Sequence, residues 1–342
     1  MTLQSSGTIR WSDIRNEFGA NISGGGVSLG RYRNSDSNFG NKNVGSLTDL
    51  PLDIGVPKTG TISASNFYSK RLNMVLDMYS GSSENRVNCR TRYNDSNKVK
   101  VVGQYKARPS NTDNTRVIVN INKTFGSERG STNRVAVRSG GWGSNCDLEF
   151  EIGSNGKIYG AGGNGGNGGS ASNGRGSDGG AGSTAMGIEY TCTINNLGRI
   201  QSGYGGGGGG SGRQEYRRSG KKGGRWVGSS GGGGGGGAGL PTSTGGDSPS
   251  NAFGGGSNGS DGGNGSNQSS GSGGGGGASA GSGGDGAAVN NSSTKGQNGA
   301  AGGPSGGTGG ANGWALITTQ GSLPSISGNG VVGRTSTNTN IE

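Results

Sequence analysis

The sequence contains no histidine and is poor in cysteine, proline and aromatic residues. Among its 342 residues, 3 are Cys, 7 are Pro and 6% are Phe, Trp or Tyr. Histidine is the commonest general base near neutral pH and the commonest metal ligand, so its absence argues against catalytic and metal sites. Cys89, Cys146 and Cys192 are too few and too scattered for a disulfide framework or a zinc site. We therefore expect no enzyme activity, no cofactor and no metal, and three free thiols in a protein made in a reducing compartment.

Long apolar runs are missing as well. No stretch approaches the about 18 apolar residues that a membrane span needs. The first residues, MTLQSSGTIRW, lack the basic flank and apolar run of a signal peptide. With 25% hydrophobic residues, a single large apolar core is excluded. The net charge of +11 favours anionic partners such as nucleic acid, acidic polysaccharide or lipopolysaccharide, without choosing among them.

Glycine is the residue present in excess. There are 85 glycines, most of them between Gly160 and Gly313, whereas ordinary usage is about 7%. Such a composition is typical of disordered chains, because it buries too little apolar surface. The spacing offers an ordered alternative, since GGNGGNGGS from Gly162 repeats every three residues. This is the period of polyproline II-type helices, and with so few prolines collagen is excluded. Polyglycine II helices packed side by side would supply each other's backbone hydrogen-bond partners.

A short apolar motif recurs beside the glycine tracts. It reads Ile, three residues, Gly, one residue and then Ile or Leu, at 152–158, 194–200 and 317–323. We expect each copy to be a pair of strands that turns at its glycine. The three copies should stack at the base of the glycine bundle and fix its register. The anchoring residues would be Ile152, Ile158, Ile194, Ile200, Ile317 and Leu323.

Two regions precede the glycine tracts. Residues 1–71 hold a duplicated unit, SGTIRWSDIR and TGTISASNFY, in which Ser12 and Ser65 suit the N-caps of short helices. Residues 72–150 hold Val- and Ile-rich runs such as RVIVNIN and DLEFEI, which predict a small antiparallel β domain. Residues 151–342 complete the chain as a glycine-rich domain. The expected fold class is mainly β plus a polyglycine II helical bundle, with very little α-helix.

The chief interruption of the glycine tracts is GRQEYRRSGKKGGRWVG, residues 212–228. Basic residues alternate there with aromatic ones, and the flanking tracts suit a loop that joins two glycine helices. Such a mixture suits sugar faces and anionic groups, or single-stranded nucleic acid, while the plainer alternative is a solvated loop. A second interruption contributes Phe253. The candidate binding residues are Arg213, Tyr216, Arg217, Arg218, Lys221, Lys222, Arg225, Trp226 and Phe253.

Some of these motifs are found together in one class of protein. The GTI units near the N-terminus, the run NGKIYGAGGNGGNGG and the later GWALITTQGS resemble those of glycine-rich tail-fibre and adhesin proteins of tailed bacteriophages. The resemblance implies a polyglycine II sandwich whose distal loops determine the host receptor. By that resemblance, residues 212–228 match one of the loops, although their strong basic charge departs from the pattern and favours an anionic glycan over a protein receptor.

The resemblance also implies a role and partners. It implies a non-enzymatic component of the virion tail, made in the host cytoplasm, with residues 1–71 docking to other tail or baseplate proteins. The partner at the other end would be a host-surface glycan, lipopolysaccharide or outer-membrane protein, with a homotrimer as the default assembly and no nucleic acid as ligand. One alternative is a structural baseplate or fibre-connector protein without receptor contact. Another is an ice-binding protein on a polyglycine scaffold, against which the basic loop argues.

Overall fold

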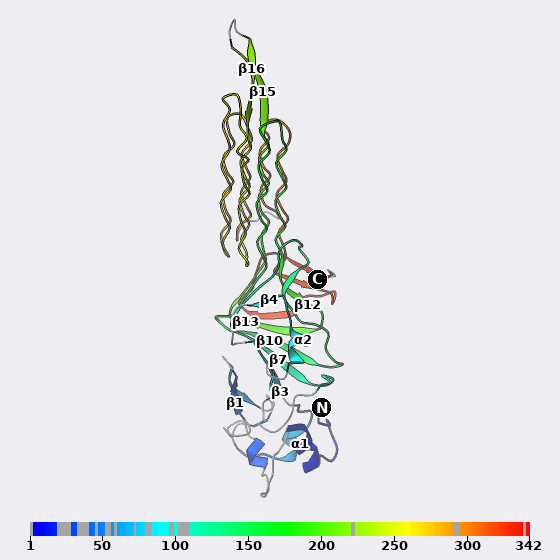
Figure 1. The fold of residues 1–342 in the computed structure, drawn as a ribbon. Coiled ribbons are helices and arrows are strands. Elements are labelled where there is room, and N and C mark those ends of the chain that lie inside the picture. The colour runs from blue at the N-terminus through cyan, green and yellow to red at the C-terminus, as the bar shows by residue number, and fades with distance from the viewer. Residues whose placement is uncertain are drawn as a thin grey trace.

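The computed structural model of the chain is elongated, with an N-terminal region, a β body and a set of glycine-rich rods following one another along its length (Figure 1). It describes residues 3–18, 29–32, 41–44, 47–51, 56–57, 60–71, 73–78, 84–95, 99–101, 110–219, 223–289, 295–337 and 340–342.

The N-terminal region is built around a small aromatic cluster. Its elements are α1 (Trp11–Phe18), the 3-10 helices η1 (Leu29–Tyr32) and η2 (Ala64–Phe67), and the antiparallel strands β1 (Asn41–Val44) and β2 (Leu47–Pro51). The Phe67 ring packs edge to face on Phe18 and Tyr32, with centroids 5.7 and 5.8 Å apart. Edge-to-face packing is the favoured geometry for such rings, and all three side chains are fully buried. The cluster joins the helices into one small core.

The two copies of the duplicated unit share a capping contact, although the first forms the α-helix α1 and the second the shorter 3-10 helix η2. The helices begin at Trp11 and Ala64, so Ser12 and Ser65 lie inside the first turn, and the prediction that they are N-caps is wrong. The residue after each serine makes the capping contact instead. Asp13 Oδ2 accepts a hydrogen bond from Arg10 N at 2.8 Å, and Asn66 Oδ1 accepts one from Ser63 N at 2.8 Å. A side chain in the first turn thus binds the backbone amide that precedes the helix, as in half of a capping box.

The body is a three-sided parallel β-helix, in which the chain visits three sheets in turn. Within the described residues, the first sheet consists of β3 (Asn73–Met78), β7 (Arg116–Ile121), β10 (Asp147–Ile152), β13 (Cys192–Asn196) and β18 (Ser325–Gly328), with β6 (Val99–Val101) at its edge. The second consists of β4 (Glu84–Asn85), β8 (Thr124–Gly126), β11 (Lys157–Tyr159), β14 (Arg199–Gln201) and β19 (Val331–Val332). The third consists of β5 (Val87–Asn88), β9 (Val135–Arg138), β12 (Thr184–Ile188), β17 (Leu316–Thr318) and β20 (Thr335–Thr337), and α2 (Cys89–Tyr93) follows β5.

The expected antiparallel domain is therefore wrong. The strands β3, β7, β10, β13 and β18 pair in parallel, and β6 is antiparallel to β3 at the sheet edge. Consecutive strands turn a corner into the next sheet instead of folding back on each other. Alternation of buried and exposed residues, as in DLEFEI of β10, is the same in either case. The pattern therefore identified the strands but not their pairing partners.

The core consists of side chains that stack between successive coils, where one coil is one passage of the chain through the three sheets. Leu76, Val119, Phe150 and Ile194 occupy one register position on neighbouring strands, and all are buried. Complete burial of such a side chain contributes about 1.5–3 kcal/mol. The stacks run perpendicular to the strands and so bind successive coils to one another.

The apolar motifs lie at corners of this β-helix. Ile152 ends β10 and Ile158 lies in β11, a different sheet, so the prediction that each motif is a pair of mutually paired strands is wrong. Ile158 is paired with Ile200 across the second sheet, and both are fully buried. Ile194 lies in the first sheet. The third motif lies elsewhere in the coil: Ile317 is in β17 of the third sheet, and Leu323 precedes β18 and is 40% exposed.

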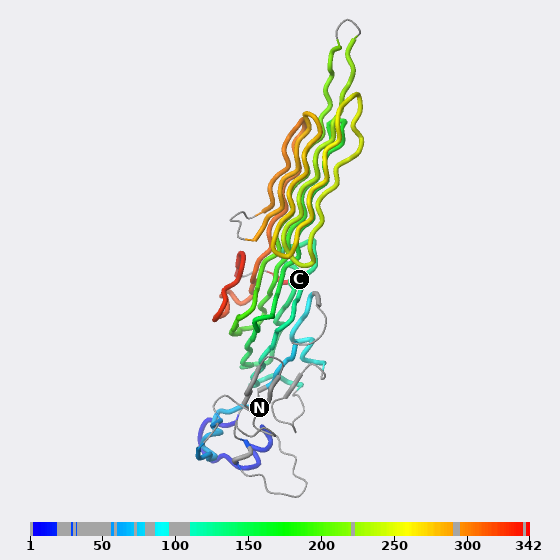
Figure 2. Tube along the Cα trace, turned by 90° about the vertical axis from the view of Figure 1, so that its left-hand side faces the viewer, coloured from blue at the N-terminus to red at the C-terminus, as the bar shows by residue number. Residues whose placement is uncertain are grey.

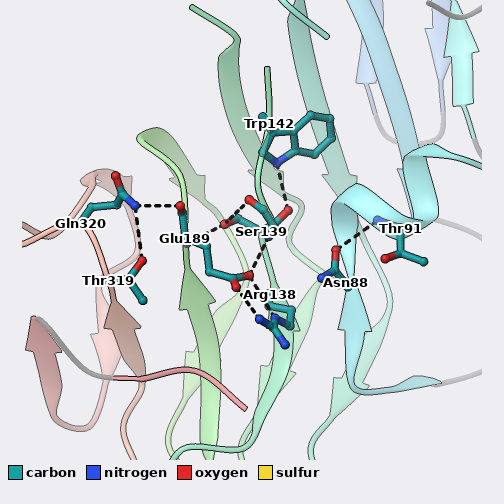
Figure 3. A network of polar contacts seen from close by, with 9 residues as sticks. Asn88, Thr91, Arg138, Ser139, Trp142, Glu189, Thr319 and Gln320 are labelled. Atoms are coloured by element: carbon teal, nitrogen blue, oxygen red, sulfur yellow. Dashed lines mark hydrogen bonds and ion pairs between the residues drawn. The ribbon is translucent and has the colours of Figure 1, made fainter. Parts of the chain in front are cut away.

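A polar network crosses the edge of the third sheet (Figure 3). The Glu189 carboxylate, after β12, accepts hydrogen bonds from Arg138 Nε at 3.0 Å and from Gly140 N at 3.0 Å. The hydrogen bond with Glu189 raises the pKa of Arg138. Gln320 Nε2, after β17, donates to the Glu189 backbone carbonyl at 2.7 Å. The network thus connects three successive coils.

The glycine tracts are insertions at the corner between the second and third sheets. Residues 160–183 connect β11 to β12, and residues 202–315 connect β14 to β17. These insertions run away from the body as side-by-side rods (Figures 1 and 2). The rods are residues 160–170, 174–183, 202–212, 230–239, 243–250, 256–266, 270–277, 281–289, 295–302 and 306–313.

Backbone amides of an inner rod donate to different neighbouring rods at successive residues and return to the same neighbour at every third residue. Rod 202–212 shows the pattern. Gly203, Gly206, Gly209 and Gly212 donate to rod 174–183, Tyr204, Gly207 and Gly210 donate to rod 230–239, and Gly208 and Ser211 donate to rod 295–302. The direction of donation therefore repeats every three residues along the rod, and Gly205 N donates to the Asn312 side chain of rod 306–313.

Outer rods have fewer neighbours, and Asn or Asp side chains take the place of the missing carbonyls. Asn164 Oδ1 and Asn167 Oδ1 accept from Thr244 N and Asp247 N at 3.1 and 3.0 Å. Asp178 accepts from Thr308 N at 2.7 Å, and this hydrogen bond lowers the pKa of its carboxyl group. The three-residue repeat of Asn in GGNGGNGGS therefore places an acceptor toward the next rod once per turn.

Substitution of a glycine on an inner rod should destabilise the protein. A Cβ on Gly207 would lie 1.9 Å from the carbonyl oxygen of Gly284, whereas a Cβ on Gly275 would find Ser260 Oγ at 3.6 Å, an ordinary contact. We expect Gly207→Ala to lower stability by about 1–3 kcal/mol or more through overpacking. Gly275→Ala should be neutral, or stabilising by about 0.4–1 kcal/mol through the unfolded chain. Thermal unfolding of the two variants would contradict the packing described here if their Tm values were equal.

A half-buried carboxylate lies on the face of the first sheet opposite the core. Glu151 pairs in register with Asn120 and Asn195, and Asn195 Nδ2 donates to its carboxylate at 2.9 Å. Burial raises the pKa of Glu151 from 4.5 to about 7, and a hydrogen bond and repulsion from Glu149 add to the effect. The folded state therefore binds more protons than the unfolded chain between these two values.

Stability of the body should accordingly depend on pH. As pH rises from about 4.5 to 7, the contribution of Glu151 falls, because the folded state then loses a proton that the unfolded chain has already lost. We expect Glu151→Gln to raise the Tm at pH 8 and leave it nearly unchanged at pH 4. Equal pH profiles for the variant and the natural protein would show that Glu151 does not titrate in this window.

Candidate functional site

The basic and aromatic interruption forms a β-hairpin beyond the rods, at the end of the molecule opposite the N-terminal region (Figure 1). The strands β15 (Arg213–Arg218) and β16 (Gly224–Ser229) pair antiparallel, and Ser219 N donates to Gly223 O at 3.0 Å across the turn. They continue rods 202–212 and 230–239, which are already hydrogen bonded to each other. The bundle therefore fixes the register of the hairpin.

One face of the hairpin carries two exposed aromatic rings. Tyr216 lies directly opposite Trp226, and their ring centroids are 5.3 Å apart at an interplanar angle of 63°. Tyr216 Oη accepts a hydrogen bond from Gly224 N at 3.1 Å, which orients the phenol ring. The residues are 50% and 55% exposed. Large aromatic side chains presented to solvent in this way are typical of contact surfaces.

Phe253 extends this face from a neighbouring turn. Phe253 N and O both bond to Gly228, at 3.1 and 3.0 Å. A Cβ on Gly228 would lie 2.3 Å from the Phe253 ring, so the ring covers the hairpin where a side chain is absent. Gly228 is two residues from Trp226 along the strand, so the two positions share a face. The Phe253 ring, which covers Gly228, therefore lies on the same face as the Trp226 ring. The rings of Phe253, Trp226 and Tyr216 therefore line one side of the hairpin, with Phe253 37% exposed.

The opposite face carries more positive than negative charge. Glu215 pairs with Arg213 at 3.5 Å and also with Arg217. Arg217 lies directly opposite Arg225, and like charges facing each other across strands are destabilising. Among the described residues, Arg225 on this face has no ion-pair partner, and neither has Arg218, which lies on the aromatic face two residues from Tyr216. The hairpin thus has one carboxylate for several guanidinium groups.

Three of these arginines line a hollow at the far end of the hairpin. The hollow has a volume of about 440 Å³, and it is lined by Arg217, Arg218, Ser219, Gly223, Gly224 and Arg225. A concave site with several guanidinium groups suits an anion that accepts hydrogen bonds in several directions. Its size admits a small anionic group together with part of the molecule that bears it.

The structure gathers most of the candidate residues predicted from the sequence. Arg213, Tyr216, Arg217, Arg218, Arg225, Trp226 and Phe253 lie on the hairpin or against it, and Lys221 and Lys222 lie outside the described residues. The sequence reasoning missed Glu215, which pairs with two of the arginines. Alternation could have revealed it, because side chains two apart on a strand share a face.

The described residues also bear on reactive thiols, metal sites and membrane-spanning helices. Cys89, Cys146 and Cys192 are buried free thiols, and burial raises the pKa of Cys146 to about 11 and that of Cys192 to about 12. Among the described side chains, no group of three or more Cys, Asp or Glu residues could hold a metal ion. None of the helices in the described part of the chain is long and apolar enough to cross a bilayer.

Comparison with known proteins gives one weak similarity. No protein-family model matches the chain, and no curated protein is significantly similar to it. Among solved structures, the chain is similar to the gp37-gp38 adhesin tip complex of the bacteriophage S16 long tail fiber. The two are 19% identical over 80% of this chain and 86% of that chain, with a TM-score of 0.37. A likeness at this level assigns neither fold nor function to the present chain.

Proposed function

We propose that the chain is a non-enzymatic adhesin of a phage tail fibre, which attaches the particle to the host surface through the β15–β16 hairpin. The observation that supports it most is the pair of half-exposed rings, Tyr216 and Trp226, at the free end of a long molecule. Exposure of aromatic rings of this size to water is unfavourable, and their burial against a ligand lowers the free energy. The resemblance of the glycine tracts and GTI units to phage tail proteins supplies the biological setting.

The proposal assigns a different task to each end. The N-terminal region would dock to other tail proteins, and it lies at the opposite end from the hairpin (Figure 1). The rods between them would be polyglycine II helices, supported by the donation of backbone amides to three neighbours in rotation. A bundle of such helices would hold the hairpin well clear of the particle.

Amide exchange tests the rigidity that this function requires. Gly207, Gly210, Gly234 and Gly235 donate to neighbouring rods at 2.7–2.9 Å. We expect peptides from 202–212 and 230–239 to exchange slowly in hydrogen–deuterium measurements, since opening one rod breaks bonds to several others. Exchange at the rate of an unstructured glycine peptide would rule out the rod as a rigid support.

Loss of the aromatic pair should weaken attachment and leave assembly intact. We expect the Tyr216→Ala, Trp226→Ala double variant to reduce adsorption to host cells by about tenfold or more, because each large contact residue of this kind contributes about 1–2 kcal/mol or more. Leu197→Ala is the matched control, since Leu197 is 56% exposed but lies between β13 and β14 in the body. Particle assembly and adsorption are measured for both variants. Normal adsorption of the double variant would exclude the hairpin as the attachment site.

A further inference from the structure

The end of the hairpin carries two unlike surfaces, with Arg217 and Arg225 on the face opposite the aromatic rings and Arg218 on the same face as them. Tyr216 and Trp226 form an apolar surface, whereas Arg217, Arg218 and Arg225 surround a hollow at the adjoining end. Arg218 and Tyr216 connect the two: Arg218 lines the hollow and shares a face with Tyr216 two residues away, and Tyr216 Oη accepts a hydrogen bond from Gly224 N, which also lines the hollow. A ligand that contacts Arg218 in the hollow therefore lies beside the Tyr216 ring.

The charges at the hollow are balanced only in part. Arg217 shares Glu215 with Arg213, while the described residues offer Arg218 and Arg225 no carboxylate. Arg217 and Arg225 face each other in the strand register. Bringing two guanidinium groups together costs free energy unless an anion lies between them. The arrangement is therefore complementary to a group of concentrated negative charge.

We propose that the hollow binds a phosphate monoester on a host-surface glycan while Tyr216 and Trp226 contact the adjoining sugar. This inference rests on the proposed function and specifies its ligand. Phosphate carries up to two negative charges and directs its oxygens tetrahedrally, so it can accept hydrogen bonds from guanidinium groups on both strands. A carboxylate has one charge and one plane, and it satisfies fewer of these donors.

The dimensions of the hairpin favour a glycan over a protein partner. A stable protein–protein interface buries about 800 Å² on each side. A two-stranded hairpin that projects alone beyond the rods is narrow for such a footprint (Figure 1). A compact ligand needs only the hollow of about 440 Å³ and the neighbouring rings.

The test compares one glycan with and without its phosphate. Surface glycan is extracted from a strain to which the full-length protein adsorbs, and one half is treated with hydrofluoric acid to remove phosphate. Binding of the full-length protein to each is measured by biolayer interferometry. We expect dephosphorylation to weaken binding about tenfold or more, and added salt to weaken binding to the phosphorylated glycan only.

Variants locate the phosphate on the protein. Arg218→Gln and Arg225→Gln should each weaken binding to the phosphorylated glycan about tenfold, or about 1.4 kcal/mol, and leave binding to the dephosphorylated glycan unchanged. Arg175→Gln is the charge-matched control, because Arg175 is 59% exposed, pairs with Asp178 and lies outside the hairpin. Circular dichroism checks that each variant is folded. Equal losses in the Arg175 and Arg218 variants would show a general effect of charge and overturn the site.

Other outcomes separate this inference from the function on which it rests. The phosphate inference is wrong if binding survives dephosphorylation. It is also wrong if the protein adsorbs to cells but not to their extracted glycan, which is the result that a protein receptor would give. In either case the adhesin function stands if the Tyr216→Ala, Trp226→Ala variant still loses adsorption. If the full-length protein adsorbs to no strain that the phage infects, the adhesin function itself fails.

Discussion

Direct contact between glycine backbones is the interaction on which this molecule depends. Ordering a residue costs about 1–2 kcal/mol, and glycine loses more freedom than any other residue. The rods offset this cost with amide hydrogen bonds to several neighbours, and they form these bonds only because no side chain separates them. On Gly209, for example, a Cβ would lie 1.9 Å from the carbonyl oxygen of Asn167. A rod alone would leave its amides to water, so the rods are stable as a bundle or not at all.

The β-helix supplies what the rods lack, which is a fixed register. Tyr159 and Gln201 pair at the ends of β11 and β14, and the next residue, Gly160, donates to Gln201 O at 2.9 Å. From there Gly163 donates to Tyr204 and Gly166 to Gly207, so the offset between the chains stays constant into the rods. The ladder of a buried parallel sheet thus continues as a ladder of hydrogen bonds between the glycine rods. Stacked apolar side chains in the body set an alignment that the glycines then propagate.

The rods and the hairpin could be recognised from the sequence, because each has a short repeating pattern of residues. Asn at every third position marks the outer rods, and alternating arginine and aromatic residues mark the hairpin. Parallel pairing was not accessible, because a strand alternates in the same way whether its partner is parallel or antiparallel. Insertions as long as residues 202–315 also conceal the repeat of the coils. The third apolar motif matched the other two in sequence but not in position, since Ile317 lies in the third sheet and Ile152 and Ile194 lie in the first. The hollow is a property of the folded hairpin turn, and no spacing in the sequence encodes it.

The bundle also explains why exposed aromatic rings and clustered arginines are found at its end. Inner faces of the rods accept few side chains, such as those of Tyr204, Ala238 and Ala287, and the polar side chains of the outer rods, such as Asn164 and Asp178, are already used as hydrogen-bond acceptors. Freedom to carry rings and charges remains at the turns, and the β15–β16 hairpin is the turn that extends furthest from the body (Figure 1). Substitutions there change the contact surface without disturbing a rod. The same close packing that makes the shaft intolerant of substitution therefore leaves its tip able to carry side chains of many kinds.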